Sequence, residues 1–280
     1  MIGKRRKITL DMQPPMVSIC IVFAIAAACV LANLIAPYGV TDMDAGALDA
    51  APDASHIFGT DTLGRDLFSM ILYGGRDSLL IGCLATCIST LIAVVYGCVS
   101  GLAPRVAGDV MMRFVELLLS IPGILLIIFL QAMLGEPTIF SISLVIGITS
   151  WMNISKIVRS EVRQIRNTDY VLAARTMGGR FFYILWRHLM PNFISSIMFM
   201  VVSNIGSAIA TEATLSFLGL GLPLTKVSWG SLMSMSQEAM LSGCWWIILL
   251  PGVFLVTMLV CITDIGDYIR KKNNRLFSNL

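Results

Sequence analysis

Residues 156–192, KIVRSEVRQIRNTDYVLAARTMGGRFFYILWRHLMPN, form the one long polar segment between two apolar stretches of the chain. Only two acidic residues oppose its basic residues, which are Lys156, Arg159, Arg163, Arg166, Arg175, Arg180 and Arg187. Side-chain oxygens over Asn167–Asp169 can cap a helix, and Gly178-Gly179 supplies a stop, so we predict a short helix over Tyr170–Met177. Such a segment is either an amphipathic helix lying on the lipid or an attachment point for a soluble partner, and the residues alone leave both readings open.

The composition is typical of a membrane protein with several spans. Of 280 residues, 56% are hydrophobic and 13% are charged, and the mean hydropathy is +0.82. A soluble core could not enclose so much apolar sequence. The seven cysteines form no CxxC pair of the metal-binding type, so we interpret them as small packing residues and expect no metal site. The sequence therefore predicts an all-α polytopic membrane protein.

Six stretches without a charged residue predict six transmembrane helices, because about 20 apolar residues cross a bilayer. They lie at 16–36, 78–102, 117–135, 137–155 and 191–211, with the last centred on 245–263. The first stretch follows a basic start and so resembles a cleavable signal. We favour a retained helix, because the apolar part of a signal is only about 7 to 15 residues long.

Basic residues predict the orientation, because cytoplasmic segments of membrane proteins are enriched in Lys and Arg. With six spans and a cytoplasmic N-terminus, only Arg65, Arg76 and Lys226 of the 20 basic residues fall outside. Both termini are therefore expected in the cytoplasm. The chain then divides into a cytoplasmic tail (1–15), the first helix (16–36), an external loop (37–77), a five-helix core (78–266) with a cytoplasmic loop (156–190) and an external loop (212–244), and a cytoplasmic tail (267–280).

Polar residues in the fifth predicted span point either to a wet path or to helix packing. Spacings of seven, four and four residues place four hydroxyls on one stripe with an asparagine beside it; the five residues are Ser196, Ser203, Asn204, Ser207 and Thr211. Polar groups inside a membrane face protein, water or cargo, whereas small hydroxylated residues also serve plain packing. At the outer end, Glu212 is a gate residue or a solvated helix terminus, and we favour the solvated terminus.

No catalytic constellation is visible in the sequence. His56 and His188 fall on opposite sides of the membrane and neither has a carboxylate cluster around it, so we expect no catalytic residue. The GxxxxGK[ST] phosphate-binding loop is absent, so energy for uphill transport must enter through a partner or an ion gradient. Within the third span, Pro122 must kink or interrupt the helix.

Several motifs together resemble one family of transporters. Tyr170-Val-Leu-Ala-Ala-Arg-Thr-Met-Gly178 with the later Pro191 resembles the EAA loop of ABC importer membrane subunits. Three further stretches strengthen the match: Phe58-Gly-Thr-Asp-Thr-Leu-Gly-Arg-Asp66, Leu215-Ser-Phe-Leu-Gly-Leu-Gly221 with Trp229-Gly230, and Gly266-Asp267. Over nearly its whole length the chain looks like the C-type permease of dipeptide, oligopeptide and nickel importers.

The resemblance implies a type I ABC importer permease in the bacterial inner membrane. It implies a homologous B-type permease as partner, two cytoplasmic ATP-binding subunits and an external solute-binding protein, with ATP and Mg on the partners and no cofactor on this chain. It also implies that the predicted short helix is a coupling helix that docks on an ATPase through Asp169, Tyr170, Ala173, Ala174, Arg175, Gly178 and Gly179.

Two departures from the family pattern bear on the substrate: the segment after Gly221 lacks the usual Pro-rich run, and the tail from Asp267 lacks the usual ending. Leu172 stands where the motif has its name-giving Glu, which is common in this subfamily. Short peptides are the expected substrates, with nickel or a metal chelate as the alternative. A stand-alone channel, a gradient-driven carrier and an integral membrane enzyme are the rival functions. The spans hold almost no acidic residue for ion coupling, which argues against the carrier.

Overall fold

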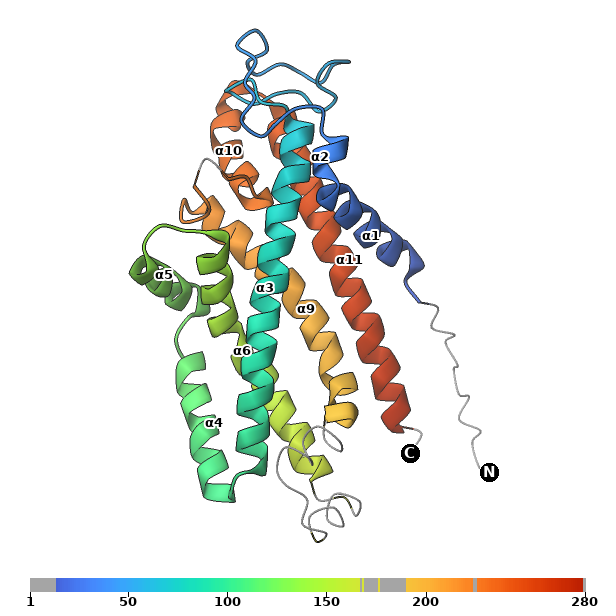
Figure 1. Ribbon diagram of the computed structural model, residues 1–280, viewed down its shortest axis with the longest axis vertical. Coiled ribbons are helices and arrows are strands. Elements are labelled where there is room, and N and C mark those ends of the chain that lie inside the picture. The colour runs from blue at the N-terminus through green and yellow to red at the C-terminus, as the bar shows by residue number, and fades with distance from the viewer. Residues whose placement is uncertain (1–13, 167, 169–175, 177–189, 224–225, 279–280) are drawn as a thin grey trace, which may run out of the picture.

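The computed structural model is a helical bundle whose longest helices run side by side along its long axis (Figure 1). It describes residues 14–166, 168, 176, 190–223 and 226–278. Over these residues no strand is formed beyond the isolated bridge between Thr60 and Asp66. Helices close their backbone hydrogen bonds within one segment, which suits a bilayer that offers no partner to free N–H and C=O groups.

The N-terminal helix packs on the outside of the bundle. Helix α1 (Met16–Val30) and the single turn α2 (Ala32–Ile35) lie against α3 (Leu67–Leu102) and α11 (Trp245–Ser278) (Figure 1). A polar contact ties α1 to α11, because the Ser18 hydroxyl donates to Asp264 Oδ2 over 2.5 Å. The remaining surface of α1 carries exposed apolar side chains such as Phe23, as expected of a helix that faces lipid.

Helix α3 begins earlier than the sequence suggested. The expected external loop ran to residue 77, but the helix starts at Leu67, where the Asp66 side chain caps it by accepting from the Ser69 backbone N–H. Arg76 and Asp77 therefore lie on the helix and not in a loop. With 36 residues, α3 spans about 54 Å at a rise of 1.5 Å per residue, so its first turns extend beyond the apolar part of a bilayer.

The centre of the bundle is the packing of α3 on α6 (Ile139–Ile165). Glycines let the two backbones approach closely, as is common between helices in membranes. A Cβ atom at Gly97 would lie 2.6 Å from Cβ of Val158, and one at Gly101 would lie 2.7 Å from Cγ1 of Val162. At the other end of the contact Gly147 packs against Ile88 in the same way.

The third predicted span is broken. Helix α4 (Arg105–Leu119) and α5 (Gly123–Leu134) meet at an angle of 86°, and the break falls at residues 120–122. The interruption expected at Pro122 is confirmed, since proline has no N–H to donate and restricts the residue before it. The span expected over 117–135 is thus divided at this break: its first residues belong to α4, and α5 turns away from them.

The C-terminal half of the chain contains two long helices, α9 (Met190–Phe217) and α11, and the shorter helix α10 (Trp229–Ser242) between them in sequence. Helices α9 and α11 pack along each other, and α10 folds back between them at the end of the bundle that also carries residues 37–66 (Figure 1). The expected external loop 212–244 thus contains the end of α9 and a complete helix.

The number of spans in the described residues is lower than the six expected. Four helices are long and apolar enough to cross a membrane, or five if the bent pair α4–α5 counts as one span. Helix α1 is apolar but has only 15 residues, and Leu31 separates it from α2. The described residues therefore have the helices of a multi-pass membrane protein, but the expected count of six transmembrane helices is not confirmed.

Candidate functional site

The hydroxyl residues of α9 do not share one environment. Ser203 and Ser207 are exposed on the bundle surface, and Thr211 is half-buried and donates to the Ser207 carbonyl oxygen over 2.8 Å. Ser196 is buried, and its Oγ has no hydrogen-bond partner among the described residues. The exposed part of the expected path stripe is thus Ser203 and Ser207, with the half-buried Thr211 one turn further toward the C-terminal end of α9.

Asn204 points away from that stripe and joins two helices. Its side-chain Nδ2 donates to Thr86 Oγ1 over 3.2 Å and to Ser89 Oγ over 2.9 Å, both on α3. Such amide–hydroxyl bonds contribute about 0.6 kcal/mol on average between helices in a membrane. In this structure Asn204 therefore serves the packing of α9 on α3, which was the alternative to the path reading.

Glu212 is the largest departure from the sequence-based reading of α9. We favoured a solvated helix terminus, but the residue is 0% exposed. Three hydroxyls donate to its carboxylate: Ser216 and Ser228 to Oε1 over 2.7 and 2.6 Å, and Ser78 to Oε2 over 3.1 Å. A buried carboxylate requires such partners, since an unpaired one is very costly in an apolar environment. The solvated reading is wrong because helices distant in sequence cover this end of α9.

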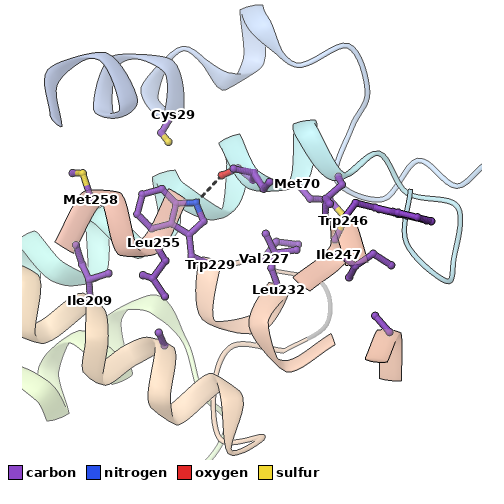
Figure 2. Close-up of a cluster of buried hydrophobic side chains, with 14 of the residues drawn as sticks. Cys29, Met70, Ile209, Val227, Trp229, Leu232, Trp246, Ile247, Leu255 and Met258 are labelled. Atoms are coloured by element: carbon purple, nitrogen blue, oxygen red, sulfur yellow. Dashed lines mark hydrogen bonds between the residues drawn. The ribbon is translucent and has the colours of Figure 1, made fainter. Parts of the chain in front are cut away.

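Helix α10 is fastened at its first turn by the same cluster. Ser228 caps it in a reciprocal capping box with Ser231, and the Trp229 backbone N–H donates to Ser78 Oγ over 3.1 Å. The Trp229 ring is fully buried among side chains of α1, α3, α9 and α11, and its Nε1–H donates to the Ile71 carbonyl oxygen over 3.0 Å (Figure 2). A Cβ at Gly75 would lie 2.6 Å from Trp229 Cζ2, so the ring fits only against glycine.

Residues 37–66 form a structured cap over the same end of the bundle (Figure 1). Within it Arg65 and Asp61 make a buried ion pair of 2.7 Å, and His56 Nδ1 lies 3.0 Å from Asp66 Oδ1. Gly64 has φ +73° and touches the Asp44 backbone, which leaves no room for a side chain. The Trp246 indole N–H donates to the Thr60 carbonyl oxygen over 3.1 Å and so joins the cap to α11.

The chain resembles proteins of known family. Residues 93–275, more than half of the chain, match the family model described as "Binding-protein-dependent transport system inner membrane component". The chain belongs to this family. The motif at 58–66 lies before the matched region, yet it builds the cap described above.

Relatives of this permease extend the match to the N-terminal part. The dipeptide transport system permease protein DppC of Bacillus subtilis is 36% identical over 85% of this chain and 74% of its own length. The oligopeptide transport system permease protein OppC of the same organism is 34% identical over 91% of this chain and 83% of its own length. The chain is thus the membrane component of a transport system and resembles permeases named for peptides.

A solved structure shows the same permease fold. The MetNI methionine ABC transporter, in an inward-facing conformation, has a chain that superposes with a TM-score of 0.59, at 17% identity, over 72% of this chain and 95% of that chain. At this identity the likeness concerns the fold alone, which is the ABC importer permease fold.

The segment expected to dock on an ATPase lies outside the described residues, except for Thr168 and Thr176. This holds for Asp169, Tyr170, Ala173, Ala174, Arg175, Gly178 and Gly179, and for the predicted helix that contains them. Its starting point is described: the Arg166 guanidinium donates to the Gly101 carbonyl oxygen over 2.8 Å, at the C-terminal end of α3. The C-terminal end of α6 is therefore fixed to the end of α3.

A cavity opens at the opposite end of the permease, beside the Glu212 cluster. Its volume is about 480 Å³, and its lining includes Ser216, which binds Glu212, together with Glu136 and Lys226. The cavity thus presents one carboxylate and one ammonium group near the C-terminal end of α9. Among the described residues no group of three or more His, Cys, Asp or Glu side chains could hold a metal ion.

Proposed function

We propose that the chain is the permease subunit of an ATP-driven importer that carries short peptides, and that it forms half of the translocation path. The observation that carries this proposal is the likeness to oligopeptide permease OppC, which extends over 91% of this chain and 83% of that relative. The outer cavity supports a peptide as cargo, because Glu136 and Lys226 carry the charges opposite to those of a peptide amino terminus and carboxylate.

The proposed assembly contains a homologous B-type permease, two cytoplasmic ATP-binding subunits and an external solute-binding protein. This chain binds no cofactor in the proposal, and ATP with Mg is bound and hydrolysed by the partners. Ala173 and Ala174 permit a close approach to an ATPase and Gly178 permits a sharp turn after the helix. The coupling helix then transmits ATPase closure to α6 and α9, between which it lies in sequence.

The proposed topology has six spans with both termini in the cytoplasm, α1 and the bent pair α4–α5 each counting as one. Charge segregation supports it. The cap, the first turns of α3 and the segment before α10 lie at one end of the bundle and carry Arg65, Arg76 and Lys226, whereas the start of α4 and the end of α6 lie toward the other end and carry Arg105, Arg159 and Arg163 (Figure 1). Ser203, Ser207 and Thr211 form the polar lining of the path in this proposal, because they occupy one side of α9. Ser196 and Asn204 flank it from within the bundle.

The experiment that tests this function compares variants of the docking segment in the assembled transporter. Ala174→Glu and Gly178→Asp place a charge where the proposed ATPase contact is closest, so both are expected to keep the permease in the membrane but abolish peptide uptake and co-purification of the ATPase. Ala107→Glu, at an exposed position in the first turns of α4, is the matched control and should transport as the parent does. Normal uptake by Ala174→Glu and Gly178→Asp would contradict the docking role.

A further inference from the structure

A second cavity lies between α4 and α6, at the end of the bundle away from α10. Its volume is about 280 Å³, far more than the roughly 30 Å³ share of a water molecule. The cavity is therefore large enough for a phosphate group and its oxygens. It is lined by Met112, Glu116, Lys156, Arg159, Ser160 and Arg163. None of these residues lines the first cavity, lies on the polar stripe of α9 or belongs to the proposed docking residues between 169 and 179.

Positive charge is in excess around this cavity. Arg159 is only 9% exposed and donates through Nη2 to Asp109 Oδ1 over 2.5 Å, and Arg163 Nη2 lies 3.6 Å from the same oxygen. The exposed Arg113 pairs with Glu116 over 3.0 Å. Lys156 has no carboxylate partner among the described residues. Four cations and two carboxylates leave two positive charges for a ligand.

Two features indicate that the cations around this cavity can bind a ligand in addition to forming the Arg159–Asp109 ion pair. The buried Nε of Arg159 has no hydrogen-bond partner in the described part of the chain, so this guanidinium is not fully satisfied by Asp109. A guanidinium and an ammonium on one wall offer the donors that phosphate oxygens accept best. The single carboxylate on the opposite wall, Glu116, is held by Arg113 and is therefore partly neutralised.

The position along α6 places these cations near a membrane surface. Counting from Ile139 at a rise of 1.5 Å per residue, Lys156 lies about 26 Å and Arg163 about 36 Å along the helix. The apolar part of a bilayer is about 30 Å thick, so the cavity falls at the level of the lipid headgroups. Helix α4 also exposes Val110, Phe114 and Leu117, on a face turned away from the lining residues Met112 and Glu116, so this helix offers an apolar surface to acyl chains as well.

We infer that the cavity between α4 and α6 binds the phosphate of an anionic phospholipid headgroup. Basic pockets between transmembrane helices suit such headgroups, and each nearby cation strengthens the attraction. Lys156 and Arg163 supply the two uncompensated charges, Ser160 supplies a hydroxyl, and Arg159 with Asp109 holds the wall in place. In the proposed topology this end of the bundle faces the cytoplasmic leaflet, but binding of the phosphate does not depend on that orientation.

The test uses the assembled transporter, because a partner subunit covering the cavity would exclude lipid. The complex is purified in neutral detergent and titrated with phosphatidylglycerol, with phosphatidylcholine and with inorganic phosphate, and bound species are counted by native mass spectrometry. The parent is expected to retain phosphatidylglycerol in preference to phosphatidylcholine. The variant Lys156→Gln/Arg163→Gln should bind phosphatidylglycerol at least about tenfold more weakly, since two cations near the phosphate are lost.

The matched control is Lys271→Gln/Lys272→Gln on α11, which removes the same net charge from exposed residues of another helix. It should bind phosphatidylglycerol within twofold of the parent. Equal binding by the α6 variant and the parent would overturn the inference, as would equal retention of the two lipids by the parent. Binding of inorganic phosphate without any preference for phosphatidylglycerol would show a free-anion site and would overturn the assignment to lipid. Since no peptide enters the experiment, its outcome is independent of the proposed transport function.

Discussion

Replacing Glu212 tests the cluster that fastens α10. In Glu212→Ala the acceptor of three hydroxyls is removed from a site that is 0% exposed. Ser216 lies one turn along the same helix and can turn its hydroxyl to a backbone carbonyl, as serines in helices often do. Ser78 and Ser228 come from α3 and α10, so their bonds to the carboxylate are lost outright.

The expected loss follows from those two bonds. A hydrogen bond contributes about 0.5–1.5 kcal/mol between neutral groups and about 1.5–3 kcal/mol to a charged one, so two bonds give about 3 kcal/mol for Glu212→Ala. Glu212→Gln keeps the size of the side chain and one acceptor oxygen, which can still serve Ser216 and Ser228. Its expected loss is about 1 kcal/mol, the value for one hydrogen bond.

Equilibrium unfolding of the purified permease in mixed micelles measures these losses, with tryptophan fluorescence as the signal because Trp229 is buried beside the cluster. A double-mutant cycle adds specificity: Glu212→Ala combined with Ser228→Ala should show a coupling of about 1–2 kcal/mol, since the two residues share one bond. The control Ser155→Ala, whose hydroxyl donates within α6, should be additive with Glu212→Ala to within about 0.5 kcal/mol. A Glu212→Ala permease as stable as the parent, or one whose coupling to Ser228→Ala equals that to Ser155→Ala, would refute the reasoning.

Three further predictions follow from the described contacts. Gly97→Ala brings its Cβ to 2.6 Å from an α6 side chain and should lower the free energy of unfolding by about 1–3 kcal/mol. The control Gly123→Ala meets nothing within 4 Å and should leave the free energy of unfolding unchanged. Thermal unfolding in detergent compares the two variants. Asn204→Leu loses two hydrogen bonds to hydroxyls of α3 and should lower the free energy of unfolding by about 1 kcal/mol in the same assay. An unchanged melting temperature would show that Asn204 does not stabilise the contact between α9 and α3. Burial, and after it the nearby Asp49 carboxylate, raise the pKa of the Cys244 thiol. Because only the thiolate reacts with a maleimide, alkylation of Cys244 in a variant without other cysteines should be slow at neutral pH and become faster as the pH rises. Fast labelling at neutral pH would contradict this.

The sequence predicted those features that depend on neighbouring residues. The break at Pro122 and the apolar stretches of α3, α6, α9 and α11 follow from local chemistry, and the structure contains them. The start of α3 was missed because Arg76 and Asp77 end the charge-free stretch, although a helix that extends beyond the membrane can carry both. Its signal was present in Asp66, a good helix cap directly before the true start.

The environment of Glu212 could not be read from α9, because its partners are distant in sequence. Ser78 is 134 residues away and Ser228 is 16 residues away across the end of α9. A carboxylate at a helix end next to polar, glycine-rich sequence is solvated in most arrangements, and only the folding back of α10 buries it. The serine before Trp229 offered a weak signal, since a capped helix start predicts that the broken segment 213–243 contains a helix.

The reach of a polar side chain explains which residues of α9 join helices and which do not. Thr211 and Thr214 each donate to a carbonyl oxygen one turn back in their own helix, so their hydroxyls are satisfied without any neighbour. An amide or a carboxylate extends farther from the backbone and cannot be satisfied in that way, so each must find donors or acceptors on another helix once it is buried. Asn204 and Glu212 do this on α3 at two levels of the bundle. Periodicity alone therefore grouped residues that differ in environment: Ser203 and Ser207 are exposed, Thr211 bonds within its own helix, and Asn204 bonds to α3.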